Sequence, residues 1–170
     1  KPLNVASYRC FREDAQGKLP QLLPNTIKRL ISDGKNPVSE ECLIGFCALQ
    51  PDLHELVLSH YAHTDEAFYL RLGKAVPKLE TLELNFSIHI DSGIIKSISS
   101  SFSHIKYLHL SGIELYSSLE ALNMPKLKGL HLDNCGILPA KYTSQFSQLC
   151  ELSLFNMDWN ALKEIVKAAR

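Results

Sequence analysis

Short segments that alternate aliphatic and polar residues recur along the chain. Segment 79–84 reads Leu-Glu-Thr-Leu-Glu-Leu, and segments 105–110 (Ile-Lys-Tyr-Leu-His-Leu) and 127–132 (Leu-Lys-Gly-Leu-His-Leu) repeat its pattern. Each copy has an aliphatic residue at its first, fourth and sixth positions, which predicts a short strand with one buried face. A loop and a more variable segment follow each copy. The pattern therefore predicts a stack of similar units, each built on one strand.

Seven units of this kind account for the whole chain. Their first aliphatic positions are separated by 24, 26, 26, 26, 22 and 22 residues. The first unit matches the pattern least well, because Ala6 and Tyr8 stand at its fourth and sixth positions. We expect residues 1–170 to form one domain. Its strands are expected to start near Leu3, Ile27, Leu53, Leu79, Ile105, Leu127 and Leu149.

Helical periodicity follows three of the predicted strands. Ser39 is placed to cap the first helix, and two glutamates follow it in the first turn. Thr64 or Asp65 begins the second helix, which Pro77 closes, and Asp91 begins the third. Apolar residues recur at intervals of three and four in each segment, so each helix is expected to turn one apolar stripe toward the strands.

The last units have different return segments. Those around Leu119–Leu122 and Tyr142–Phe146 are short and predict a single turn or a piece of 3₁₀ helix. Segment 161–168 reads as a final helix whose apolar stripe has no later unit to cover it. This stripe either folds back on the preceding unit as a cap or forms a surface for a partner.

Together these features resemble a known family. The pattern Leu-x-x-Leu-x-Leu-x-x-Cys, with Cys135 at its cysteine position and three spacings of 26 residues, resembles the cysteine-containing leucine-rich repeats of F-box/leucine-rich-repeat proteins and, more widely, ribonuclease-inhibitor-like solenoids. The chain departs from that family in lacking an F-box segment and in the residues that hold the cysteine position of other units. Those residues are Lys35, Tyr61, Ser87, Ile113 and Met157.

The resemblance implies an α/β leucine-rich-repeat solenoid. In such a fold the chain forms a right-handed arc, with parallel strands on the concave face and helices or short turns on the convex face. It also implies a role as the substrate receptor or adaptor of a ubiquitin-ligase assembly. This functional implication rests on analogy with the family, because one fold serves many functions.

Charge and cysteine content narrow the class of protein further. Lys plus Arg and Asp plus Glu both number 18, so the net charge is zero and gives no general attraction to nucleic acid. No apolar run approaches the ~20 residues of a membrane span. The five cysteines are odd in number, and several lie in apolar stretches. We interpret them as reduced core thiols, which favours an intracellular location, cytoplasmic or nuclear.

The strand face opposite the leucines carries the candidate site. Equivalent residues of neighbouring parallel strands stand about 4.8 Å apart, so the repeat alignment places Glu83, His109 and His131 side by side. Tyr107 and Asp133 flank this row. An aromatic ring among oriented polar groups is typical of a protein interface, although the same residues could simply be solvated. The predicted partner-binding residues are Glu55, Thr81, Glu83, Asn85, Tyr107, His109, His131, Asp133 and Phe155.

We find no pattern that predicts catalysis. Two histidines beside carboxylates raise the possibility of a metal or acid–base site, but side chains on a flat ladder run parallel and do not converge on one point. His60 and His63 fall in an expected exposed loop. The chain has no phosphate-binding loop, nucleophile elbow or Cys-x-x-Cys pair. We therefore expect no catalytic residues, cofactor, metal or small-molecule substrate.

The sequence predicts a protein-binding module that works without catalysis. Its partner is expected to be a protein, bound on the concave face, and not a nucleic acid. Within this class the resemblance favours the ubiquitin-ligase role. The alternatives are the sensor arc of an innate-immune protein and an inhibitor that blocks the active site of an enzyme.

Overall fold

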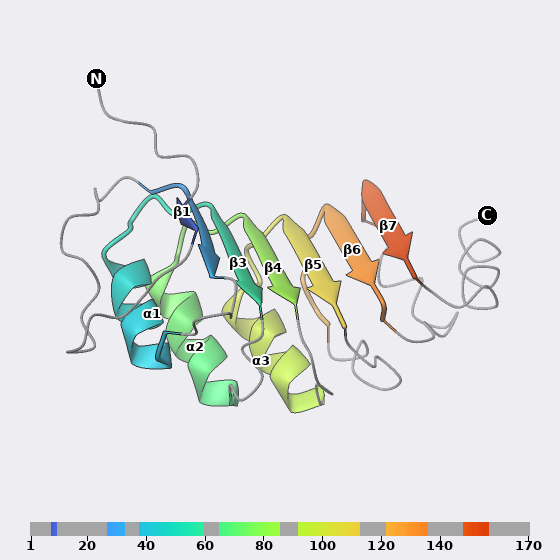
Figure 1. The fold of residues 1–170 in the computed structure, drawn as a ribbon. Coiled ribbons are helices and arrows are strands. Elements are labelled where there is room, and N and C mark those ends of the chain that lie inside the picture. The colour runs from blue at the N-terminus through green and yellow to red at the C-terminus, as the bar shows by residue number, and fades with distance from the viewer. Residues whose placement is uncertain are drawn as a thin grey trace, which may run out of the picture.

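The computed structural model of the chain describes residues 8–9, 27–32, 38–59, 65–85, 92–112, 122–135 and 148–156. These residues contain seven strands that form a single sheet in chain order, and every neighbouring pair is parallel (Figure 1). The prediction of parallel strands, one for each repeated unit, is therefore confirmed. The strands are β1 (Tyr8–Arg9), β2 (Arg29–Ser32), β3 (Glu55–Ser59), β4 (Thr81–Asn85), β5 (Tyr107–Ser111), β6 (Gly129–Asp133) and β7 (Glu151–Phe155).

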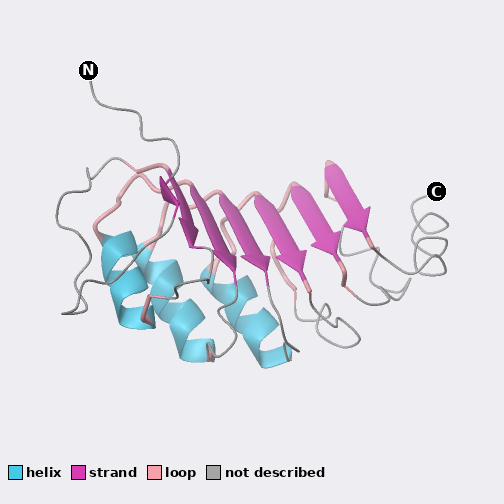
Figure 2. Ribbon diagram, viewed as in Figure 1, coloured by secondary structure: helices cyan, strands magenta, loops and turns pink. Residues whose placement is uncertain are grey.

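Three helices lie on one side of this sheet (Figure 2). They are α1 (Glu40–Ala48), α2 (Glu66–Ala75) and α3 (Ser92–Ser101), and each connects two successive strands between β2 and β5. A parallel pair needs a crossover connection, and here the return segment of each unit supplies it. The result is an α/β repeat fold with strands on one layer and helices on the other.

The predicted helix starts can be checked at two positions. Ser39 caps α1, where its Oγ accepts a hydrogen bond from the backbone N–H of Cys42 at 3.3 Å. Asp65, and not Thr64, caps α2, where its Oδ1 accepts from the N–H of Phe68 at 2.8 Å. Asp91 lies outside the described residues.

The predicted return segments of the fifth and sixth units and the final helix, segment 161–168, also lie outside the described residues, apart from Leu122. Leu122 is buried. His60 and His63, predicted to lie in an exposed loop, are also outside the described residues.

The aliphatic positions lie in register across the sheet. Leu56 pairs with Leu82, Leu82 with Leu108, and Leu108 with Leu130, and each is at most 1% exposed. Strands β2 to β7 begin two residues after each predicted first position, as with Leu53 before β3. That leucine still belongs to a turn, because its N–H donates to the carbonyl of the residue three positions earlier at 3.1 Å.

The first unit differs from the repeat alignment. Tyr8 pairs with Leu30 and Arg9 with Ile31, whereas the alignment set Ala6 opposite Leu30. The register is thus shifted by two residues. This unit lacks the leucines that fix the register elsewhere, and a shift of two leaves every residue on the same face of the sheet.

The core lies between the sheet and the helices. The leucines of the strands pack there with apolar residues of the helices, among them Phe68 and Leu72 of α2 and Ile98 of α3. Ser99 ties α3 to the next unit, because its Oγ donates to the carbonyl of Asn123 at 2.9 Å and accepts from the Asn123 N–H at 2.7 Å. The core therefore runs continuously from one unit to the next.

The interpretation of the cysteines as core thiols is only partly correct. Cys47 and Cys135 are buried, and burial raises the pKa of the Cys47 thiol to about 12. Cys150, however, is exposed. It occupies the second position of its unit, and this position holds charged or polar residues elsewhere, such as Lys106 and Lys128. Among the described residues, no helix is long and apolar enough to cross a membrane.

Candidate functional site

The open face of the sheet, defined here as the face opposite the three described helices, carries the third, fifth and seventh residues of the units that contain β3 to β7. The strand register places these residues in rows. Glu83 lies beside His109 and His109 beside His131, as the sequence predicts. The row of third positions runs through Thr81, Tyr107, Gly129 and Glu151.

Three rings form what we call the aromatic row, namely His109, His131 and Phe155. The ring centroids of His109 and His131 lie 4.0 Å apart, and those of His131 and Phe155 lie 4.9 Å apart with an angle of 9° between the rings. Phe155 comes from the seventh position, so its side chain reaches diagonally to stack on a fifth-position residue. Its exposed fraction is 54%. The row is thus a continuous surface of three rings, of which His131 and Phe155 are stacked.

Glu83 anchors one end of this row. Its Oε1 accepts a hydrogen bond from Nδ2 of Asn85 at 2.9 Å, and its Oε2 lies 3.6 Å from Nδ1 of His109. The His109 ring is the main reason that the pKa of Glu83 lies below its ordinary value, against the opposing effect of burial. Asn85 also donates to Oγ of Ser59 at 3.1 Å. Polar contacts across three strands therefore fix the Glu83 carboxylate.

The two histidines have different surroundings. Partial burial is the main cause that lowers the pKa of His131, and the neighbouring His109 lowers it further. The Nε2 atom of His109 is buried and has no hydrogen-bond partner.

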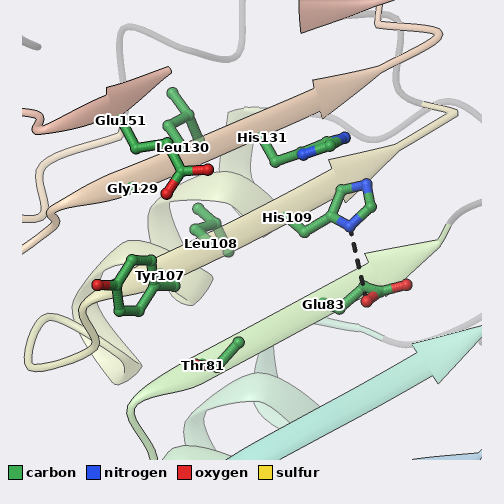
Figure 3. Close-up of a pocket in the computed structure, with 9 residues that line it drawn as sticks. All are labelled: Thr81, Glu83, Tyr107, Leu108, His109, Gly129, Leu130, His131 and Glu151. Carbon is green, nitrogen blue, oxygen red and sulfur yellow. Dashed lines mark ion pairs between the residues drawn. The ribbon is translucent and has the colours of Figure 1, made fainter. Parts of the chain in front are cut away.

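A hollow of about 170 Å³ opens beside the aromatic row (Figure 3). Its lining comes from four successive strands, β4 to β7. Gly129 lets the ring of Tyr107 pack against the backbone of β6, since a Cβ atom there would lie only 2.6 Å from Cδ1 of Tyr107. The lining residues are Thr81, Glu83, Tyr107, Leu108, His109, Gly129, Leu130, His131 and Glu151.

The nine residues predicted for partner binding divide into two groups. Thr81, Glu83, Tyr107, His109 and His131 line the hollow. The others lie around it on the same face; they are Glu55, Asn85, Asp133 and Phe155.

Two of the surrounding carboxylates already have partners. Glu55 pairs with Arg29, with Nε and Oε1 2.8 Å apart. Asp133 accepts a hydrogen bond from Nδ2 of Asn156 at 2.8 Å. Neither carboxylate lines the hollow.

Gly129 and Glu151 belong to the site but were missing from the prediction. Both stand in the same row as Tyr107, so the repeat alignment could have found them. A prediction based on side-chain chemistry passes over a glycine, whose contribution here is to let the ring of Tyr107 lie against the backbone of β6.

Among the described residues, no three His, Cys, Asp or Glu side chains are grouped so that they could hold a metal ion. The site offers stacked rings, an exposed tyrosine and two carboxylates, Glu83 and Glu151, around a small depression. These groups can bind a complementary surface.

Comparisons with known proteins leave the family open. No family model matches the sequence, and no curated protein matches it. Among solved structures, a chain of the crystal structure of the TLR13–ssRNA13 complex aligns with 77% of this chain at 19% sequence identity and a TM-score of 0.40. The aligned part is 26% of that chain. The fold of the present chain is therefore established by its own strand register.

Proposed function

We propose that this chain is a non-catalytic module that binds a protein partner on the open face of its sheet. The observation that carries the proposal is the aromatic row beside the exposed Tyr107, on a face that the described helices leave uncovered. Tyr107 is 43% exposed. Exposed aromatic residues near the centre of a rigid surface are typical hot spots of protein interfaces.

The different spacings of strands and helices support the same proposal. Neighbouring strands stand about 4.8 Å apart, whereas packed helices need about 8–10 Å. The helical layer must then be longer than the sheet, which bends the stack so that the open face is concave. Connections between parallel strands are right-handed in nearly all proteins. We propose a single right-handed arc of seven leucine-rich units, residues 1–170, that flattens after β5.

A protein partner fits the charges better than a nucleic acid does. The chain has no net charge. The hollow is lined by two carboxylates, and no lysine or arginine of the described residues lines it. Phosphate groups would be repelled at this point, because nucleic-acid affinity depends chiefly on cationic side chains that meet phosphates.

A narrower role rests on the resemblance of the repeats alone. On that basis the chain would be the substrate receptor or adaptor of a ubiquitin ligase, in the cytoplasm or nucleus. An innate-immune sensor arc or an enzyme inhibitor is the alternative. An F-box segment in the same polypeptide would favour the ligase role, whereas a nucleotide-binding module with a phosphate loop would favour the sensor.

The proposal can be tested by crosslinking followed by measured affinity. A photo-crosslinking phenylalanine analogue is placed at position 155 on the open face and, as a control, at position 70 on α2, where Leu70 is 45% exposed. We expect a protein to be captured from position 155 and not from position 70. The double variant Tyr107→Ala, His109→Ala should then bind the purified partner at least about tenfold more weakly.

A matched control removes two exposed side chains from the helical side, Lys74→Ala with Lys96→Ala. This variant should bind the partner as the wild-type chain does. Equal affinity for the double variant at 107 and 109 would exclude this cluster as the binding site. Capture from α2 alone would move the interface to the helices, and tight binding of single-stranded RNA on the open face would contradict a protein partner.

A further inference from the structure

The size of the hollow on the open face limits what it can hold. Its volume of about 170 Å³ is smaller than the ~300–1,000 Å³ of most small-molecule sites. On its floor the ring of Tyr107 lies against β6 at Gly129, where a Cβ atom would be 2.6 Å from Cδ1 of that ring. A space of this size suits a single side chain of a binding partner.

The lining of the hollow is negative. Glu83 and Glu151 both line it, and in Figure 3 the carboxylate of Glu151 lies over Gly129. The lowered pKa of Glu83 keeps it ionised at neutral pH, and the lowered pKa of His131 keeps that ring neutral. Within the described part of the chain, Glu151 makes no ion pair.

Two of the cations that lie near this region, Arg29 and Lys106, are already paired. Arg29 contacts Glu55 at 2.8 Å, and Lys106 contacts Glu80 at 2.6 Å. Among the described residues, therefore, no lysine or arginine neutralises the hollow.

The walls of the hollow add aromatic rings to these charges. Tyr107 stands on one side, and His109 and His131 stand on the other (Figure 3). A cation over the face of an aromatic ring is attracted by the ring electrons. A guanidinium group is planar and stacks on rings while it donates several hydrogen bonds to carboxylates, whereas an ammonium group is compact and strongly hydrated.

We infer that this hollow receives an arginine side chain of the protein partner, stacked against Tyr107 and paired with the carboxylate of Glu151, while the Glu83 carboxylate adds negative charge to the same hollow. The inference rests on the proposed function, since it assigns the kind of residue that the partner presents. It adds a specificity that the exposed rings alone do not give, because the hollow selects a cation of defined shape.

The test uses a small probe and the full chain. Amide resonances of the ¹⁵N-labelled protein are followed while N-acetyl-L-arginine amide is added, and the experiment is repeated with the citrulline analogue, which has nearly the same shape but no charge. We expect the arginine probe to shift the amides of Tyr107, Gly129 and Glu151, with a Kd on the order of millimolar. The citrulline and N-acetyl-L-lysine amide probes should bind more weakly.

Variants then assign the binding to the two carboxylates. Glu151→Gln should weaken the arginine probe by about two- to fivefold, as expected for a partly exposed ion pair, and the double variant Glu83→Gln, Glu151→Gln should remove the shifts. Glu41→Gln on α1, which removes the same charge from an exposed position, should leave them unchanged. The unchanged amides elsewhere in each spectrum show that the variant is folded.

The outcomes separate this inference from the proposed function. Shifts that are absent at ~20 mM probe, equal for citrulline, or unaffected by both glutamate variants would overturn the arginine pocket. If the partner is nevertheless captured at position 155, the protein-binding function stands without it. If the arginine probe binds as described but position 155 captures nothing, the pocket stands and the proposed function fails.

Discussion

Tyr107 and Leu108 are consecutive residues with opposite surroundings. Tyr107 is 43% exposed on the open face, and Leu108 is 1% exposed in the core. This difference follows from the strand geometry, because successive side chains point to opposite faces of the sheet. A substitution at Tyr107 therefore tests binding, and a substitution at Leu108 tests stability.

The separation makes a prediction about stability. Leu108→Ala opens a cavity where Leu108 packs in the continuous core, and we expect it to lower the free energy of unfolding by ~2–5 kcal/mol. Tyr107→Ala, at an exposed position, should change it by less than about 1 kcal/mol. Urea unfolding of both variants measures the difference. A negligible effect of Leu108→Ala would mean that the leucines do not form the observed register.

The site residues also give the protein a dependence on pH. The pKa of His131 in the folded chain lies below its ordinary value of 6.5, so the unfolded chain takes up a proton there more readily as the pH falls through 6.5. Stability should therefore fall in this range. The pKa of Glu83 lies below its ordinary value of 4.5, so its stabilising contribution is complete above 4.5 and is lost as the pH falls through the lowered value.

Unfolding by urea between pH 7.5 and pH 5, run for the wild-type chain and for His131→Phe, isolates the histidine contribution. The ring of the variant can still stack on Phe155 but cannot bind a proton. We expect the variant to lose less stability than the wild-type chain as the pH falls. Identical slopes would show that His131 does not titrate differently in the folded and unfolded chains.

At the scale of elements, the helices differ in how closely they approach one another. Gly73 of α2 lies against the end of α3, where a Cβ atom on it would be 2.7 Å from the carbonyl oxygen of Ser101. Gly45 of α1 has no heavy atom within 4 Å of the same hypothetical atom. The close contact of α2 with α3 thus requires that residue 73 has no side chain. Around Gly45, by contrast, there is space for a methyl group.

These two glycines form a matched pair for mutation. Alanine favours a helix over glycine by ~1 kcal/mol, so Gly45→Ala should stabilise the protein by up to about that amount. At Gly73 the clash involves backbone and outweighs this preference, so Gly73→Ala should destabilise the protein by ~1–3 kcal/mol. Thermal or urea unfolding measures both. A stabilising Gly73→Ala would show that α2 and α3 are not packed this closely.

At the scale of the whole molecule, the order of the sheet is the order of the chain. Each strand pairs only with its sequence neighbours, so a site on the open face is assembled from consecutive units. The hollow draws on β4 to β7. Its geometry therefore depends on how four units stack. Substitutions in the core beneath these units are expected to alter the shape of the hollow.

Much of this arrangement could be read from the sequence. The spacing of leucines such as Leu56, Leu82 and Leu108 gave the register, since an aliphatic side chain on the wrong face would lose its burial. The helix starts at Ser39 and Asp65 could also be predicted, because the side-chain oxygen of each residue accepts a hydrogen bond from a backbone N–H that would otherwise be unpaired. The first unit, with its weak pattern, is where the register was predicted wrongly.

The sequence by itself determined which residues share a face and which strands are neighbours, because both depend on a periodic burial of leucines that local spacing records. Only the tertiary structure decided which side chains on that face contact one another. Phe155 stacks diagonally on His131, and the ring of Tyr107 lies against Gly129. Such contacts join residues of different units, and the direction of each side chain is set by what its neighbours leave unoccupied, which no spacing along the chain can specify.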